Sequence, residues 1–241
     1  MEFTLLAAAA FAVAALYGML YWEARHGNAD RCAGNLFETT VTSAAIGIFI
    51  GRIVAMVLDG VNPITHPGDI VLVRAGVSTV GATLGALAVF AWLSRSEFVP
   101  MADGISAAAL AGLAGWHAGC LARDACLGTA SDLPWAQAQE GSEITRHPVG
   151  IYAALLFAVA AIAIALWKAY GRPGLGITAS AALIAAGVIR LLVEPMQPSI
   201  SGGPTWFYAL GVVVGLAGLA WFWRARRSGS SPAEGASGGI L

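Results

Sequence analysis

Charged residues are scarce in this sequence. Of its 241 residues only 13 are lysine or arginine and 14 are aspartate or glutamate, which is 11% of the chain, whereas 58% are hydrophobic. Soluble domains carry roughly a quarter charged residues, so the composition excludes an ordinary soluble fold. The net charge of −1 also offers no basic surface for a nucleic acid. We therefore expect a membrane protein whose functional residues lie between helices.

Cysteine is scarce as well. Three cysteines are too few for a disulfide scaffold, and Cys32 is expected to be cytoplasmic and reduced. Cys120 and Cys126 would point about 240° apart on a continuous helix, so a disulfide between them requires the helix to end first. A structural disulfide and unreacted core thiols are the favoured alternatives, ahead of a redox pair or a metal site. We expect no bound metal and no cofactor.

Long apolar runs are abundant. A transmembrane helix needs about 20 apolar residues, and runs of this kind occupy 3–22, 39–58, 70–93, 102–121, 149–167, 174–193 and 204–223. They predict an all-α integral membrane protein, a bundle of seven transmembrane helices within residues 1–227. Glu2 stands where a signal peptide would have a basic residue, so the first run is expected to be retained. Residues 228–241, rich in Ser, Gly and Ala, are expected to form a disordered cytoplasmic tail.

Basic residues predict the orientation, because lysine and arginine resist transfer across the bilayer. With the N-terminus outside, the cytoplasmic segments hold eight of them: Arg25, Arg31, Arg95, Lys168, Arg172, Arg224, Arg226 and Arg227. The outer segments then hold two, Arg123 and Arg146. We therefore expect an outer N-terminus and a cytoplasmic C-terminus.

Three arginines fall within or at the edges of predicted spans: Arg52, Arg74 and Arg190. Each needs a partner, a cavity or a route to the interface, since a charge at mid-bilayer costs about 2.5 to 3.5 kcal/mol. Glu194 follows Arg190 by four positions, which places both on one helical face, and Pro195 ends the span. The pair either allows the helix to insert or forms part of a site.

Two motifs in the connection between the fourth and fifth spans carry a family resemblance. Asp132-Leu133-Pro134-Trp135 is followed by Arg146-His147-Pro148 and Tyr152. In this order and at this separation they resemble motifs of the bacterial prolipoprotein diacylglyceryl transferase family. The resemblance extends to segments of three other spans: Tyr17-Gly18-Met19-Leu20-Tyr21, Gly51-Arg52 and Gly187-Val188-Ile189-Arg190-Leu191-Leu192-Val193-Glu194.

The resemblance implies transfer of a diacylglyceryl group from phosphatidylglycerol to the lipobox cysteine of a preprolipoprotein, at a bacterial inner membrane. Arg190 would grip the phosphate and Glu194 would orient it, because a guanidinium can bind two phosphate oxygens at once. A thiol with an ordinary pKa of about 8.5 needs a base at neutral pH, and His117 and His147 are the candidates. The predicted substrate-binding residues are Tyr17, Gly128, Asp132, Arg146 and Tyr152.

Departures from the family pattern keep a second function open. The third span reads Val80-Gly81-Ala82-Thr83-Leu84-Gly85 and lacks the family's histidine, and His117 stands where the family has an arginine. The alternative is a non-catalytic membrane protein of the same fold that binds phospholipid or a membrane partner. The partners expected are phosphatidylglycerol or another anionic phospholipid and the signal peptides of preprolipoproteins. A small-solute transporter is disfavoured because the chain shows no inverted repeats.

Overall fold

The computed structural model describes residues 3–26, 35–65, 77–119, 126–138, 141–198 and 203–228. Within them lie seven α-helices: α1 (Phe3–Arg25), α2 (Leu36–Leu58), α4 (Thr79–Leu93), α5 (Phe98–Ala118), α6 (Val149–Leu166), α7 (Ile177–Val193) and α8 (Thr205–Arg227). Six of the helical segments are long and apolar enough to cross a membrane. The predicted all-α membrane bundle is confirmed. The orientation of the bundle in the membrane stays a prediction. The tail beyond residue 228 also stays a prediction, because residues 229–241 lie outside the described residues.

Two spans begin later than the apolar runs suggest. The third was predicted over 70–93, but α4 covers Thr79–Leu93, and residues 66–76 lie outside the described part. Ser78 caps this helix by accepting a hydrogen bond from the backbone N–H of Gly81. The sixth was predicted from residue 174, but α7 begins at Ile177, because Gly176 has a φ of 77° that a right-handed helix does not accommodate.

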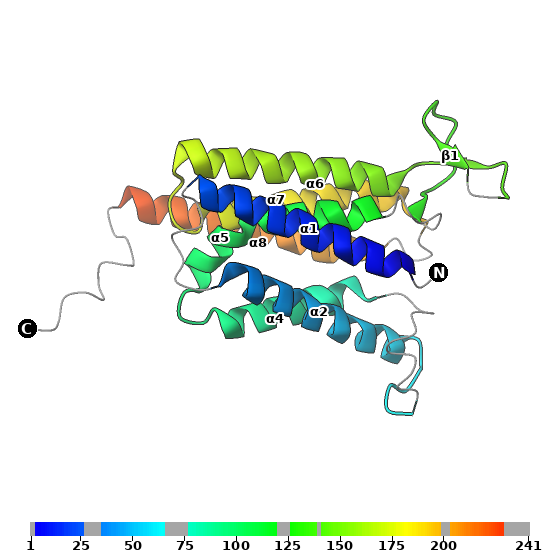
Figure 1. Cartoon of the computed structure of the whole chain (residues 1–241), viewed down its shortest axis with the longest axis horizontal. Helices are drawn as coiled ribbons and strands as arrows, with labels where there is room; N and C mark the ends of the chain where they lie inside the picture. The colour runs from blue at the N-terminus through cyan, green and yellow to red at the C-terminus, as the bar shows by residue number, and fades with distance from the viewer. Residues whose placement is uncertain are drawn as a thin grey trace, which may run out of the picture.

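The helices form a five-helix group with a two-helix pair beside it. In Figure 1, α1, α5, α6, α7 and α8 lie together, and α2 and α4 form a separate pair along one side. Helix α5 packs on α1, α6 and α7. Small residues allow the close contacts, since Gly47 and Gly51 of α2 abut Ala82 and Ala86 of α4. Glycine also allows the close approach of α5 to α1, where Gly115 abuts the backbone of Phe11.

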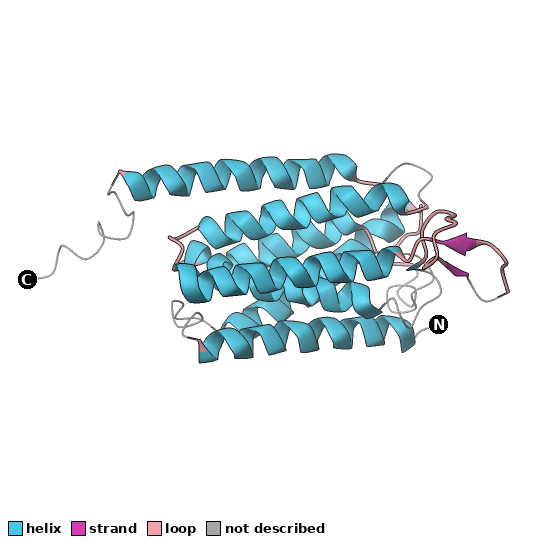
Figure 2. Cartoon of the chain, turned by 90° about the horizontal axis from the view of Figure 1, so that it is seen from above, coloured by secondary structure: helices cyan, strands magenta, loops and turns pink. Residues whose placement is uncertain are grey.

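A short hairpin lies at one end of the bundle. Strands β1 (Gln137–Ala138) and β2 (Thr145–Arg146) pair antiparallel in the connection between α5 and α6. Figures 1 and 2 show this hairpin at the end of the bundle where the chain starts. The start of α6, the end of α7 and the start of α8 are at the same end, which we call the loop end. The connection between α6 and α7, which includes a π-helical turn at Trp167–Gly171, lies at the opposite end.

Candidate functional site

Arg190 is the centre of the candidate site, in the last turn of α7 at the loop end. Its Nη2 atom donates to Oε2 of Glu194 at 2.7 Å and to the Tyr208 hydroxyl at 2.8 Å. The guanidinium carbon also lies 4.9 Å from the centre of the Tyr208 ring. The ion pair predicted from the four-residue spacing is therefore present. Tyr208, on α8, was not predicted, and no motif in the sequence points to it.

The Arg190 guanidinium retains unused donors. A guanidinium has five N–H groups, and the Nε atom of Arg190 is buried without a hydrogen-bond partner among the described residues. The side chain is 17% exposed, so it is shielded but not sealed. A buried donor without a partner is unfavourable by about 1 to 3 kcal/mol, which an incoming acceptor would relieve. The arrangement suits an anion with more than one oxygen.

Glu194 is held in place by the connection to α8. Its side chain is 5% exposed, and it opens a 3-10 turn, Glu194–Met196, that contains Pro195. Gly203 packs directly against the carboxylate with a φ of 66°, so a Cβ atom there would overlap the carboxylate oxygen. This fixed carboxylate limits the conformations that Arg190 can adopt.

His117 lies in the last turn of α5, the helix that packs on α7, which carries Arg190. Its ring stacks on Phe157 of α6 with centroids 5.6 Å apart and planes 9° apart. The phenylalanine beneath the histidine is fully buried.

The loop between α5 and α6 is fastened to both α6 and α7. The backbone N–H of Gly128 donates to the His147 carbonyl at 2.7 Å, and that of Thr129 donates to the Met196 carbonyl at 2.8 Å. Arg146 Nη1 donates to the Gly128 carbonyl at 3.2 Å. A Cβ atom at Gly128 would overlap both Val149 and the Met196 carbonyl. Gly128 therefore lies where the loop passes close to the start of α6 and to the turn that follows α7.

His147 and Tyr152 lie together at the start of α6. Their rings meet edge to face at 6.1 Å, and the Nδ1 atom of His147 is buried with no hydrogen-bond partner among the described residues. Trp135 Nε1 donates to the Tyr152 hydroxyl at 2.7 Å, which ties the Asp-Leu-Pro-Trp motif to α6. Trp135 was part of the motif but was not predicted as a site residue. Asp132 is exposed on the same loop.

Tyr17 is the predicted residue that the structure places in a different setting. It is 56% exposed on α1 and makes ring contacts with Tyr21 at 6.3 Å and with Phe37 of α2 at 5.4 Å. It lies 14 residues after Phe3, about 21 Å along α1 from the loop end. Its contacts show it facing α2, while Arg190 contacts α8.

The structure answers part of the cysteine question. Cys126 is disulfide-bonded, which excludes the free thiol at this position. The partner predicted for it, Cys120, lies outside the described residues, as does Arg74. Among the described residues no group of three or more His, Cys, Asp or Glu side chains could hold a metal ion. Arg52, the other intramembrane arginine, is buried on α2 at 4% exposure.

An apolar groove of about 360 Å³ lies between α6 and α7 at the loop end. Its lining residues are Tyr152, Leu155, Leu156, Leu192, Val193 and Met196. Val193 precedes the 3-10 turn that begins at Glu194 and Met196 ends it, so the groove lies at the same end of α7 as the candidate site.

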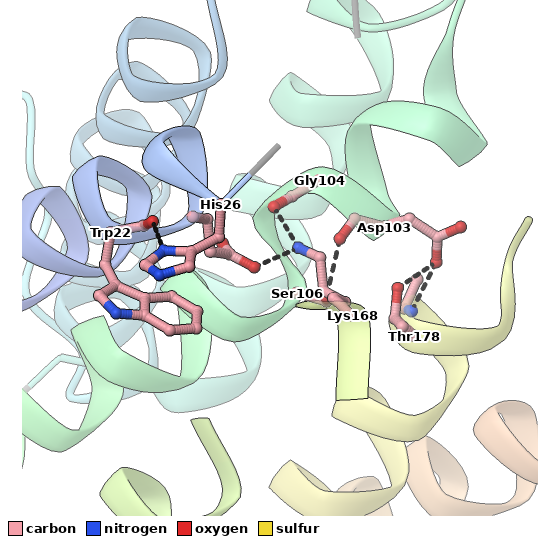
Figure 3. Close-up of polar contacts among 9 residues, drawn as sticks. Trp22, His26, Asp103, Gly104, Ser106, Lys168 and Thr178 are labelled. Atoms are coloured by element: carbon pink, nitrogen blue, oxygen red, sulfur yellow. Dashed lines mark hydrogen bonds and ion pairs between the residues drawn. The ribbon is translucent and has the colours of Figure 1, made fainter. Parts of the chain in front are cut away.

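A second polar cluster lies at the opposite end of the bundle (Figure 3). Lys168 Nζ lies 2.5 Å from Glu23 Oε1, with both side chains buried, and donates to the Gly104 carbonyl at 2.9 Å. The Asp103 carboxylate accepts from the Gly176 and Ala179 N–H groups and the Thr178 hydroxyl. The sequence had placed Lys168 among the basic residues of the cytoplasmic segments, and its buried pairing with Glu23 was not predicted.

The apolar helical segments, six of them long enough to cross a membrane, define a multi-pass membrane protein. A family model described as prolipoprotein diacylglyceryl transferase matches residues 2–225, and the chain belongs to this family.

Relatives named phosphatidylglycerol–prolipoprotein diacylglyceryl transferase occur in several bacteria. The chain is 30% identical to that of Polaromonas sp. (strain JS666) over 189 residues, 70% of this chain and 67% of the relative. It is 30% identical to that of Bartonella bacilliformis over 183 residues, 70% and 63% respectively. With that of Methylibium petroleiphilum the identity is 32% over 186 residues, 68% and 67%. The chain thus spans about two thirds of the length of these relatives.

Proposed function

We propose that this protein transfers the diacylglyceryl group of phosphatidylglycerol to the cysteine thiol of a prolipoprotein, as a multi-pass enzyme of a bacterial inner membrane. The names of its relatives supply the reaction. The observation on which the proposal rests is Arg190, a shielded guanidinium with an unused Nε donor, at the end of the bundle where an apolar groove also lies. An anionic headgroup and a hydrocarbon chain require this combination.

The reaction requires a base for the thiol and a positive charge for the departing phosphate. The thiolate sulfur forms a bond to the glyceryl carbon while the bond from that carbon to the phosphate oxygen breaks. The electron pair leaves with glycerol phosphate, and the thiol proton goes to a base. Arg190 would stabilise the charge that develops on the departing phosphate, and such preorganised donors contribute more in a water-poor site. Glu194 and Tyr208 would keep the guanidinium in the required orientation.

His147 is the better placed of the two candidate bases. Its Nδ1 atom has no partner among the described residues, so a lone pair or an N–H remains for a substrate. His117 stacks on Phe157, which suits a ring that contacts the lipid. Gly128, Asp132, Arg146 and Tyr152 would shape the entrance for the acceptor through the fastened loop. Tyr17 would contact substrate only at a distance from the phosphate.

The test uses purified protein in proteoliposomes with labelled phosphatidylglycerol and a lipobox peptide. We expect thioether product from the wild type and about 10²- to 10³-fold less from Arg190→Ala, the usual effect of removing one preorganised donor. Arg95→Ala is the matched control, because Arg95 is an exposed arginine in the turn that follows α4 at the opposite end. Product that is unaffected by Arg190→Ala would contradict the mechanism.

The non-catalytic lipid-binding protein remains the second candidate, and one observation favours it. In α4, where the family has a histidine in the third span, Gly81 and Gly85 pack against Val54 and Ile50 of α2. In these contacts Gly81 and Gly85 serve the packing of α4 on α2. Arg190-dependent binding of phosphatidylglycerol without any thioether product from the wild type would establish this second candidate.

A further inference from the structure

A larger apolar groove lies away from the candidate site. It measures about 500 Å³ and is lined by residues of α1, α5 and α6. Most of the lining is alanine and glycine, including Gly18 on α1, Ala111 and Ala114 on α5, and Ala161 on α6. Helices α1 and α6 both pack on α5 but make few contacts with each other. The groove is the space that their small side chains leave between them.

The groove is deeper in the membrane than the candidate site. Its α6 residues run from Ala158 to Leu166, about 14 to 26 Å from Val149 at a rise of 1.5 Å per residue. Its α1 residues run from Ala15 to Trp22, about 18 to 28 Å from Phe3. The hydrocarbon core of a bilayer is about 30 Å thick. The groove therefore occupies the half of the membrane farther from the loop end.

We propose that this groove binds an acyl chain of an anionic phospholipid whose headgroup lies at the opposite end of the bundle. A lipid whose headgroup meets Arg190 would fill the smaller groove near the loop end, whose α6 residues lie only about 5 to 11 Å from Val149. Its chains would reach the larger groove only at their tips. A lipid of the other leaflet has its chains at the right depth.

Size and charge select this occupant. An additional helix in the groove would have a diameter of about 10 Å and would need roughly 800 Å³ for every 10 Å of its length. The groove provides less than this volume. Trp22 is the last residue of α1 that lines the groove, and Glu23, the partner of the buried Lys168, follows it in the chain. Beyond this point Arg25 and Arg172 are exposed and can meet a phosphate. The bound acyl chain would fill the space between α1 and α6, which make few contacts with each other.

Gly18 provides a substitution that fills the groove without disturbing the helices. A Cβ atom at Gly18 meets no atom within 4 Å, so Gly18→Leu places its side chain in the open groove. Ala14→Leu is the matched control, because Ala14 is exposed on the same helix and does not line the groove. Both variants add apolar volume to α1, but only Gly18→Leu places that volume in the groove.

The experiment uses the full chain in phosphatidylcholine nanodiscs that contain a small fraction of phosphatidylglycerol with a photoreactive diazirine in its acyl chain. We expect saturable labelling of peptides from the groove-facing parts of α1 and α6, competed by unlabelled phosphatidylglycerol but weakly by phosphatidylcholine. Gly18→Leu should lower this labelling roughly tenfold, as expected from displacing about two buried methylene groups. Ala14→Leu should leave it unchanged.

Other outcomes would overturn the proposal. Labelling that rises in proportion to the probe and is equal in both variants would show bulk lipid only. A photoreactive lipobox peptide that labels the groove in place of the lipid would assign it to a helix. Thermal unfolding is an independent readout: added phosphatidylglycerol should raise the midpoint of Gly18→Leu less than that of the wild type or of Ala14→Leu, because the Arg190 site is intact in all three. None of these measurements depends on diacylglyceryl transfer, so they stand if the transferase proposal fails.

Discussion

The two ends of the bundle each bury a charged pair, but the pairs are built differently. At the loop end, Arg190 and Glu194 lie on one helix and reach a single further helix through Tyr208. At the opposite end, Lys168 follows α6, Glu23 belongs to α1, and the lysine also binds a carbonyl of α5. A pair within one helix does not hold helices together, whereas a pair between helices does. We infer that the opposite end stabilises the bundle and that the loop end remains available for a ligand.

The largest effect is expected from breaking the inter-helix pair. Lys168→Met leaves the fully buried Glu23 carboxylate without its cation, which typically lowers the free energy of unfolding by about 3 to 5 kcal/mol. Thermal unfolding in detergent measures this loss. The double variant Glu23→Leu/Lys168→Met removes both charges and should recover most of the stability. If Lys168→Met unfolds at the wild-type temperature, the inference that this end stabilises the bundle is wrong.

The next effect sharpens the comparison at the loop end. Arg190→Lys keeps the charge but replaces the planar fork of donors with one ammonium group, which cannot bind two phosphate oxygens in the same way. We expect about 10²-fold slower diacylglyceryl transfer, which corresponds to about 2.7 kcal/mol of activation free energy. The unfolding temperature should change little. Wild-type activity in this variant would mean that Arg190 serves only as a charge for Glu194.

A smaller effect is expected from the partner of Arg190 on α8. Tyr208→Phe keeps the ring beneath the guanidinium but removes the hydroxyl that accepts the 2.8 Å hydrogen bond. A hydrogen bond to a charged group contributes about 1.5 kcal/mol, so we expect roughly tenfold slower transfer. The rate at saturating phosphatidylglycerol is the measurement. A loss of stability with unchanged rate would place Tyr208 with the structural contacts.

The smallest effect concerns the fastened loop. Trp135→Phe removes the hydrogen bond to the Tyr152 hydroxyl at a partly exposed position. Neutral hydrogen bonds contribute about 0.5 to 1.5 kcal/mol, and exposure favours the lower value, so a two- to threefold effect on transfer is expected. Tyr152→Phe removes the same bond from the other side and should match it. Different effects of the two variants would show that one of the side chains has a further role.

Features that are local along the chain were predictable. The length of each apolar run predicted seven helices, because a helix satisfies its own backbone hydrogen bonds and needs only about 20 apolar residues to cross the bilayer. The spacing of Arg190 and Glu194 predicted their ion pair, because residues four apart share a helical face. Pro195 predicted the end of α7, which stops at Val193.

Features that join distant segments were decided by the tertiary structure alone. Tyr208 became the partner of Arg190 and Glu23 the partner of Lys168 because α7 packs on α8, and α1 and α6 both pack on α5. Apolar spans look alike in sequence, and in lipid the apolar surface alone does not select one neighbour over another. Shape and a few polar contacts make that choice. Composition and spacing therefore determined the spans and the paired arginine, while helix packing decided which polar groups are satisfied and which remain available.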